Sequence, residues 1–197
     1  YPTAPHFCDD IGESALRRAI LDSNEEPIPR DISAYVHLPF CLSPCFYCGC
    51  SRIVTRDRSR IGGYLARLYR EIETVSTLFA RDRYLAQLHF GGGTPNFLNP
   101  TQLADTVDVL RRQFHFADRR DSDISIEIDP RFCDPAWMPA LAASGFNRAS
   151  LGVQDFDPKV QEAVNRLQTV KETRAVVDAA RSAGFRSVNI DLIYGLP

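Results

Sequence analysis

Apolar positions recur along most of the chain with two periods, one typical of strands and one typical of helices. The run Asp123–Ile128 alternates polar and apolar residues, whereas residues 61–79 carry apolar side chains three or four positions apart. Residues 1–32 lack this regularity, apart from a short helix predicted at 13–21. We therefore expect an irregular N-terminal extension over 1–32 and a single domain over 33–197. The predicted strands are 33–40, 85–90, 123–128, 148–153 and 187–193.

The helices between these strands carry sequence signals at their ends. Asn99 followed by Pro100 predicts a helix start, because asparagine caps a helix and proline suits its first turn. Thr169 and Glu172 have the spacing of a capping box. Further helix starts and ends are predicted at Asp134, Gly145, Asp157 and Gly184.

Five strands alternating with helices imply right-handed strand–helix–strand units and a parallel sheet of the α/β class. Such a sheet is either open and doubly wound or part of a barrel. Polar or glycine-rich groups follow each of the five strands. A β/α barrel collects its site at these strand ends, whereas an open sheet concentrates ligand contacts at one switch point. The distribution therefore favours a barrel-type arrangement.

Composition and charge argue against nucleic-acid-binding, membrane and secreted classes of protein. The net charge of −2 gives no basic field for nucleic acid or a membrane surface, and no apolar run approaches the roughly 20 residues of a membrane span. The start does not resemble a secretory signal. Four of the six cysteines fall within ten residues, unlike a disulfide framework, so we expect a reducing cytoplasm. The chain begins at Tyr1 and ends just after a strand-like run, so we interpret it as a fragment or a processed chain.

The cysteine-rich stretch is the main candidate for chemistry. Cys41, Cys45 and Cys48 are spaced C-x3-C-x2-C, and Cys50 follows two residues later. Thiolates this close together suit an iron–sulfur cluster, and three ligands leave one iron of a [4Fe–4S] cluster open to a substrate. The alternative is zinc, but zinc sites usually draw two ligand pairs from separated stretches, which four cysteines within ten residues match poorly.

The cysteine loop resembles the signature of the radical S-adenosylmethionine (SAM) enzymes, and the chain as a whole resembles the oxygen-independent coproporphyrinogen III oxidase family. The resemblance covers nearly the whole sequence and implies a partial (β/α)6 barrel, of which five βα units are present here and the last strand and any later domain are missing. The matching motifs are Tyr1-Pro-Thr-Ala4, Tyr35-Val-His-Leu-Pro-Phe-Cys41, Cys48-Gly-Cys50, Ile53-Val-Thr55, Gly91-Gly-Gly-Thr-Pro95, Gly152-Val-Gln-Asp-Phe156 and Asn189-Ile-Asp-Leu-Ile-Tyr-Gly-Leu-Pro197.

The resemblance implies a reaction and its cofactors. A [4Fe–4S] cluster held by Cys41, Cys45 and Cys48 would bind SAM and yield a 5′-deoxyadenosyl radical, with no side chain acting as acid or base. The radical would start the oxidative decarboxylation of two propionates of coproporphyrinogen III to vinyl groups, giving protoporphyrinogen IX in haem biosynthesis. The implied protein is a monomer that takes electrons from a donor such as flavodoxin or ferredoxin. The resemblance implies that Cys50 is present in the family but is not needed to hold iron.

Two related functions remain as alternatives, a cluster-containing haem chaperone and a radical SAM methyltransferase that opens the haem ring. The motifs Cys48-Gly-Cys50 and Tyr1-Pro-Thr-Ala4 favour the oxidase, since we expect neither in the alternatives.

The resemblance also implies a set of SAM contacts. Gln154, Arg166 and Asp191, with Gly93 and Thr94, match the position of a second SAM molecule. The alternation of its strand places Glu127 on the same side as Ser125 and Asp129, where the alternative to a SAM contact is a salt bridge inside the barrel. The complete set is Tyr35, Tyr47, Gly92, Gly93, Thr94, Glu127, Gln154, Arg166 and Asp191.

Two further groups of residues have open interpretations. The arginines after the cysteine loop either orient the propionates of a porphyrinogen, to which guanidinium groups are suited, or are solvated loop charges. His37 and His89 are expected to be core or supporting histidines rather than metal ligands. The four arginines are Arg52, Arg56, Arg58 and Arg60.

Overall fold

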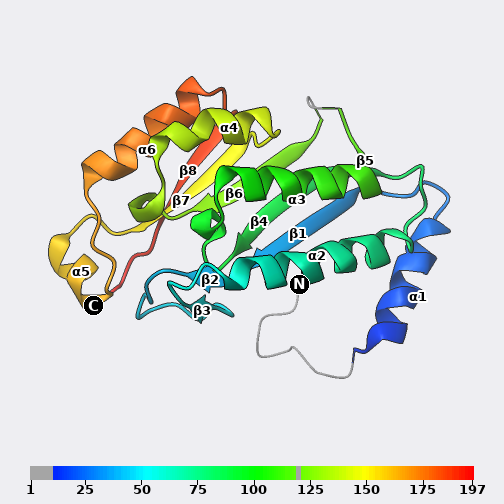
Figure 1. Cartoon of the computed structure of the whole chain (residues 1–197), viewed down its shortest axis with the longest axis horizontal. Coiled ribbons are helices and arrows are strands. Elements are labelled where there is room, and N and C mark those ends of the chain that lie inside the picture. Colours follow the sequence, from blue (N-terminus) through cyan, green and yellow to red (C-terminus); the bar gives the residue numbers. More distant parts are fainter. Residues whose placement is uncertain (1–10, 119–120) are drawn as a thin grey trace.

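A central parallel sheet organises the computed structural model, which describes residues 11–118 and 121–197 (Figure 1). The motif at residues 1–4 and Cys8 lie outside the described residues. The elements are α1 (Glu13–Asn24), β1 (Ile32–Leu38), β2 (Phe40–Cys41), β3 (Ile53–Val54), α2 (Arg60–Ser76), β4 (Tyr84–Gly92), the 3₁₀ turn η2 (Pro95–Phe97), α3 (Pro100–Gln113), β5 (His115–Phe116), β6 (Asp123–Ile128), η3 (Pro130–Phe132), η4 (Pro135–Trp137), α4 (Met138–Ala143), β7 (Arg148–Gln154), α5 (Pro158–Ala163), α6 (Val170–Ser182) and β8 (Ser187–Leu192).

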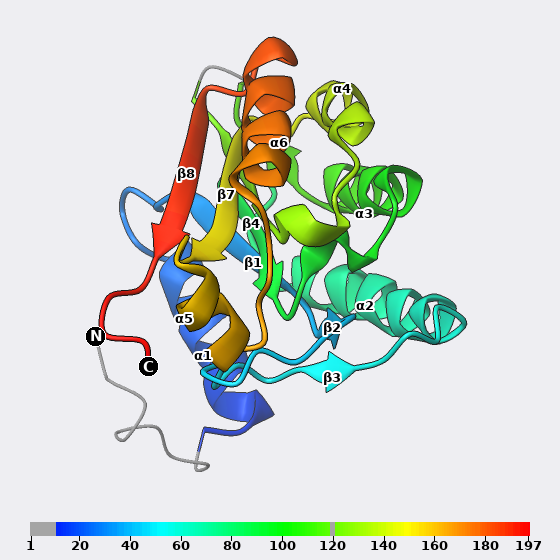
Figure 2. The ribbon, with the colours of Figure 1, turned by 90° about the vertical axis from the view of Figure 1, so that its left-hand side faces the viewer.

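The strands of this sheet follow one another in chain order. The order is β1-β4-β6-β7-β8, every pairing is parallel, and the short β5 pairs with β4. Helices α2, α3, α4 and α6 all cover the same face of the sheet (Figure 2). A doubly wound sheet would reverse direction and carry helices on both faces. The predicted α/β fold of consecutive βα units is therefore confirmed. The described residues leave β1 and β8 as the two edges, without closing the sheet.

Alternation along the strands separates the packed face from the open one. In β6, Ile124, Ile126 and Ile128 are buried on the helix-covered side, and Ser125 and Glu127 are half-buried on the other. Burying an isoleucine side chain contributes roughly 2 kcal/mol, so this alternation fixes which face of the strand points to the core. The polar face is consequently available for a site.

The predicted helix caps are present. Asn99 forms a capping box with Gln102 at the start of α3, and Thr169 forms one with Glu172 at the start of α6. The side chains of Asp134 and Asp157 accept backbone N–H bonds at the start of η4 and α5, and Gly145 and Gly184 end their helices with φ of 106° and 87°. The helix predicted from Asp134 to Gly145 begins as a 3₁₀ turn before α4.

One strand prediction needs correction, and some short strands were not predicted. The run 33–40 is broken at Pro39, because proline has no N–H for a ladder, so β1 ends at Leu38 and β2 starts at Phe40. The two-residue strands β2 and β3 pair in parallel, Phe40 with Ile53, and β5 was also not predicted. Strands this short have no measurable period. The β2–β3 pair matters because it closes the base of the cysteine loop.

No helix in the described ranges is long and apolar enough to cross a membrane. The predicted helix of the N-terminal extension is α1, and the side chain of Asn24 at its end donates to the carbonyl of Leu78 at 2.8 Å. The domain boundary at residue 32 stays a prediction.

Candidate functional site

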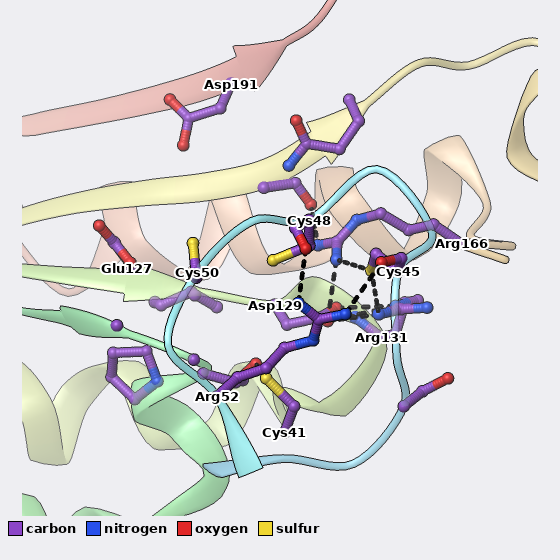
Figure 3. A pocket seen from close by; sticks show the side chains of 18 of the residues that line it. Cys41, Cys45, Cys48, Cys50, Arg52, Glu127, Asp129, Arg131, Arg166 and Asp191 are labelled. Atoms are coloured by element: carbon purple, nitrogen blue, oxygen red, sulfur yellow. Dashed lines mark hydrogen bonds and ion pairs between the residues drawn. The ribbon is translucent and has the colours of Figure 1, made fainter. Parts of the chain in front are cut away.

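A cavity opens at the carboxyl ends of the sheet strands, and the cysteine loop covers it (Figure 3). Segments from five parts of the chain line it, namely the loop after β2 and the ends of β4, β6, β7 and β8. All of the predicted site residues except Tyr35 are among its lining residues. These are Cys41, Cys45, Tyr47, Cys48, Gly92, Gly93, Thr94, Glu127, Gln154, Arg166 and Asp191.

Backbone hydrogen bonds hold the cysteine loop over the cavity. The N–H of Ile53 donates to Pro39 at 2.7 Å and the N–H of Thr55 donates to Cys41 at 2.9 Å, which joins the two ends of the loop. The Arg52 guanidinium then donates to the Cys48 carbonyl at 2.6 Å. In this loop Cys41 and Cys45 are buried, Cys48 is half-buried and Cys50 is exposed.

A buried ionic group surrounds Cys45. The Asp129 carboxylate lies 2.7 Å from Nη2 of Arg131 and 3.2 Å from Nη1 of Arg166, and all three side chains are almost fully buried. Both guanidinium groups also reach the Cys45 sulfur, at 3.3 Å from Arg166 and 3.7 Å from Arg131 (Figure 3). One carboxylate cannot balance two guanidinium groups, so one positive charge faces the sulfur. A metal-bound thiolate would complement that charge.

A second loop, between α5 and α6, supports the cysteine loop from outside. The Asn165 amide donates to the Pro44 carbonyl at 2.7 Å, and the N–H of Phe46 donates to Val164 at 3.1 Å. Arg166 follows, and its Nη2 donates to the Gly152 carbonyl at 2.6 Å. The Nε of Arg166 is buried without a protein partner and is therefore a donor available to a ligand.

The glycine turn after β4 packs against the chain itself. A side chain at Gly93 would place Cβ 2.6 Å from the carbonyl oxygen of Pro39, and Gly92 has a φ of 115°. Both positions require glycine, one for space and one for its backbone conformation. The hydroxyl of the next residue, Thr94, donates to the Cys41 sulfur at 3.4 Å. The turn thus brings Thr94 to the first cysteine.

Glu127 has a histidine as its partner. Its Oε1 lies 3.1 Å from Nε2 of His89, and no salt bridge joins it to an arginine or lysine among the described residues. Tyr35 stacks on the same imidazole and lies beside the cavity without lining it. His37 is bonded through Nε2 to the carbonyl of Ser51 at 2.9 Å. Both histidines thus have hydrogen-bond partners within the chain, and their role as supporting residues stays a prediction.

The last two strand ends bring in Gln154 and Asp191. The Asp191 carboxylate accepts from the Ser150 hydroxyl at 2.8 and 2.9 Å. Gln154 has a φ of 76°, at a register shift between β7 and β8. This left-handed conformation costs a non-glycine residue roughly 1 kcal/mol or more, and such residues concentrate at functional sites.

Burial raises the pKa of two thiols of the cysteine loop, Cys41 and Cys50. It raises the pKa of the Cys41 thiol, and the hydrogen bond from Thr94 only partly offsets this effect. Burial, together with the hydrogen bond to Cys48, also raises the pKa of Cys50. Binding iron at Cys41 would therefore displace a proton.

The sequence did not identify several residues that build the site. Asp129 was noted only as a neighbour of Glu127 at the end of its strand, and Arg131 was not singled out. Both directly follow β6 and line the cavity, so their strand-end position was an available signal. Asn165 carried no such signal. Of the four loop arginines, Arg52 lines the cavity, Arg56 lines a separate groove beside Leu167, and Arg58 donates to the Phe97 carbonyl at 2.7 Å. The arginines therefore do not form one patch.

The donor set suits an iron–sulfur cluster. Three thiols share one cavity with uncompensated guanidinium charge and an unpartnered buried N–H. Within the described ranges, no three Cys, His, Asp or Glu side chains are grouped closely enough to hold a metal ion in this arrangement. The assignment of Cys41, Cys45 and Cys48 as ligands therefore stays a prediction. Fold and site together define a cysteine-dependent β/α protein with its chemistry at the strand ends.

Comparison with protein-family models identifies the superfamily to which this β/α protein belongs. Residues 35–197 match the model of the radical SAM superfamily, and the chain belongs to that superfamily. The cofactors that the superfamily implies are a [4Fe–4S] cluster and SAM.

Curated relatives are oxygen-independent coproporphyrinogen III oxidases. The relative from Pseudomonas aeruginosa is 52% identical over 197 residues, and that from Escherichia coli is 47% identical over 197 residues. Each match covers 100% of this chain and 42% of the relative, so the chain spans about two fifths of the relatives' length.

Solved structures agree with this result. Coproporphyrinogen III oxidase from E. coli, described as a radical SAM enzyme, matches with a TM-score of 0.89 and 46% identity, over 100% of this chain and 44% of that one. Methylornithine synthase matches with a TM-score of 0.54 and 12% identity, over 94% of this chain and 53% of that one, which shows the shared fold alone.

Proposed function

We propose that this chain is the radical SAM core of an oxygen-independent coproporphyrinogen III oxidase. The reaction is the oxidative decarboxylation of two propionates of coproporphyrinogen III to vinyl groups, which gives protoporphyrinogen IX in haem biosynthesis. The observation that carries the proposal is the shared cavity, in which Cys41, Cys45 and Cys48 face the ends of four sheet strands. The similarity to coproporphyrinogen III oxidases over all 197 residues supports coproporphyrinogen III as the substrate.

The chain's residues hold and orient the cofactors. When bound, the cluster and SAM supply the 5′-deoxyadenosyl radical that takes a hydrogen from the propionate β-carbon. Cys41, Cys45 and Cys48 bind the cluster, and Arg131 and Arg166 offset the negative charge of its thiolates beside Cys45. Cys50 lines the cavity but is not required as a ligand.

The SAM contacts lie on both sides of the cysteine loop. Glu127, Tyr47 and Gly92, which line the cavity, bind the SAM at the cluster. Tyr35, which stacks on His89 beside the cavity, is a further contact of this SAM. Burial raises the pKa of Tyr47, so its phenol is neutral and presents an aromatic face. The second SAM position is formed by Gly93, Thr94, Gln154, Arg166 and Asp191.

The proposal extends to the partners and the compartment. The donor is a small redox protein such as flavodoxin or ferredoxin, and the protein works as a monomer in the cytoplasm. Free cysteines at all five described positions support a reducing compartment.

Anaerobic incubation of the protein with SAM, dithionite and coproporphyrinogen III tests the activity. The expected products are a vinyl porphyrinogen and carbon dioxide. Tight haem binding without decarboxylation would instead identify the haem chaperone, and methyl transfer with haem-ring opening would identify the methyltransferase.

Iron retention tests the ligand assignment separately. Replacing Cys41, Cys45 or Cys48 by alanine is expected to abolish iron retention after anaerobic reconstitution, because three thiolates are the minimum set. Cys50→Ala and Cys133→Ala are the controls and should keep the cluster iron. If Cys50→Ala also lost the cluster iron, Cys50 would be a fourth ligand, and the proposal of a cluster with an open iron would be contradicted.

A further inference from the structure

His89 lies at the centre of a polar row that crosses three neighbouring strands. The sheet register pairs it with Tyr35 of β1 on one side and with Ser125 of β6 on the other. The Tyr35 ring stacks on the imidazole with centroids 5.6 Å apart and planes 18° apart. Nδ1 lies 2.6 Å from Oγ of Ser125, and Nε2 lies 3.1 Å from Oε1 of Glu127. Both ring nitrogens and one ring face are thus engaged.

Hydrogen-bond chemistry assigns the protons in this row. An ionised carboxylate only accepts, so Nε2 of His89 carries the proton that it donates to Glu127. In a neutral imidazole the other nitrogen accepts, so Nδ1 accepts a hydrogen bond from the Ser125 hydroxyl. The other possible acceptor of that hydroxyl, the Leu88 carbonyl, is more distant, at 3.3 Å. The row therefore directs one N–H at one oxygen of Glu127, while Oε2 has no hydrogen bond among the described residues.

Gly91 provides the room for this arrangement. It follows His89 by two residues and lies on the same face of β4. A Cβ at Gly91 would lie 2.9 Å from Oε1 of Glu127 and 2.9 Å from the hydroxyl of Tyr35. Glycine here supplies space, because both neighbouring groups extend over the strand where a side chain would stand.

We propose that His89 is a positioning residue for Glu127: it holds one carboxylate oxygen so that the other faces the SAM site. The inference rests on the proposed function, in which Glu127 contacts SAM. The His89 and Glu127 side chains are 37% and 43% exposed, so their pairing contributes little to folding stability. Its effect is to restrict the conformations of a carboxylate that would otherwise move freely at the cavity edge.

The test is SAM affinity, measured by calorimetry on the protein reconstituted anaerobically with iron and sulfide. We expect His89→Leu to weaken SAM binding about tenfold, the scale of one hydrogen bond to a charged group, with unchanged iron content and melting temperature. His89→Gln keeps an N–H donor and should restore most of the affinity. His115→Gln, an exposed histidine on β5, is the matched control.

A double-mutant cycle separates positioning from other effects. Glu127→Ala and Glu127→Ala combined with His89→Leu should bind SAM equally weakly, because His89 acts only through the carboxylate. Additive losses would overturn the inference. Wild-type affinity in His89→Leu with a loss in Glu127→Ala would also overturn it, while leaving the proposed function intact. Wild-type affinity in Glu127→Ala would instead remove the proposed SAM contact, and the inference with it.

Two glycine substitutions, Gly91→Ala and Gly62→Ala, test the geometry without changing His89. Gly91→Ala should weaken SAM binding, since the Glu127 and Tyr35 side chains have to move away from the new methyl group. Gly62→Ala, on the exposed side of α2 with open space around it, should leave the affinity unchanged. Equal affinities for the two variants would contradict the proposed geometry.

Discussion

The two walls of the cavity carry similar kinds of charged side chains in different environments. Around Cys45, Asp129 pairs with two arginines, and the exposed fractions of the paired side chains are 5 to 11%. On the opposite side, Glu127 pairs with His89, and about two fifths of each side chain is exposed. Figure 3 shows Asp129, Arg131 and Arg166 gathered around Cys45, and Glu127 on the far side of Cys50 from that group.

This contrast separates charges that hold the site together from charges that address a ligand. A buried carboxylate between two guanidinium groups cannot be removed without leaving uncompensated charge in a region of low dielectric constant. A half-exposed pair is screened by water and contributes little to stability, but it fixes the direction of a group at the cavity edge. The buried group is therefore expected to contribute to folding stability as well as to the site, whereas the half-exposed pair is expected to act on the ligand alone.

The largest expected effect is on the buried wall. Asp129→Ala should lower the free energy of unfolding by about 3–5 kcal/mol, because Arg131 and Arg166 lose their carboxylate. The Asn96 side chain bonds only to the backbone of residue 129, so those contacts remain. Urea unfolding of the protein measures the change. A loss below 1 kcal/mol would show that the two walls do not differ as described.

An intermediate effect on stability is expected at the exposed capping box of Thr169 and Glu172. Thr169→Ala should cost about 1 kcal/mol, because it removes the capping box at the start of α6. Hydrogen bonds from Thr169 lower the pKa of Glu172 from its ordinary value of 4.5. The folded pKa is the lower one, so this contribution is present above pH 4.5 and is lost as the pH falls.

An NMR titration of Glu172 checks the capping prediction. In Thr169→Ala the pKa of Glu172 should rise only part of the way toward its ordinary value, because the backbone N–H of residue 169 still donates to the carboxylate while the hydroxyl is lost. The stability difference from the wild type should shrink in acid. An unchanged pKa would mean that the Thr169 hydroxyl does not contribute to the shift.

A smaller effect is expected where the backbone is strained between β7 and β8. Gln154→Gly should raise the free energy of unfolding by roughly 0.5 kcal/mol, because glycine adopts the φ of 76° freely but loses more chain entropy on folding. The same change should weaken SAM binding, because the side chain lines the cavity. Thermal unfolding combined with calorimetry would show the two effects with opposite signs.

The smallest stability effect is expected on the open wall. Glu127→Ala should change the free energy of unfolding by less than about 0.5 kcal/mol, in contrast to Asp129→Ala. The comparison of the two variants in one urea series tests the distinction directly. Similar losses for both would indicate that Glu127 is also a structural charge.

Much of the architecture could be predicted from local patterns. The alternation in β6 gave that strand with its observed bounds, and the capping boxes at Asn99 and Thr169 gave the starts of α3 and α6. These signals depend on residues within four positions of each other in the sequence, so they can be recognised without knowing the tertiary structure. The two-residue strands β2 and β3 were missed, since their pairing depends on a contact across the cysteine loop.

The sequence by itself determined the parallel order of the elements, the cysteine spacing and the strand-end positions that form the cavity. Only the tertiary structure decided how those groups divide their roles. The contacts of Asp129 with Arg166, of Arg166 with Cys45, and of His89 with Glu127 join residues 37 to 121 positions apart or on different strands. Burial and charge pairing arise from such long-range contacts, which no local periodicity encodes, so the difference between the two walls became visible only in the folded chain.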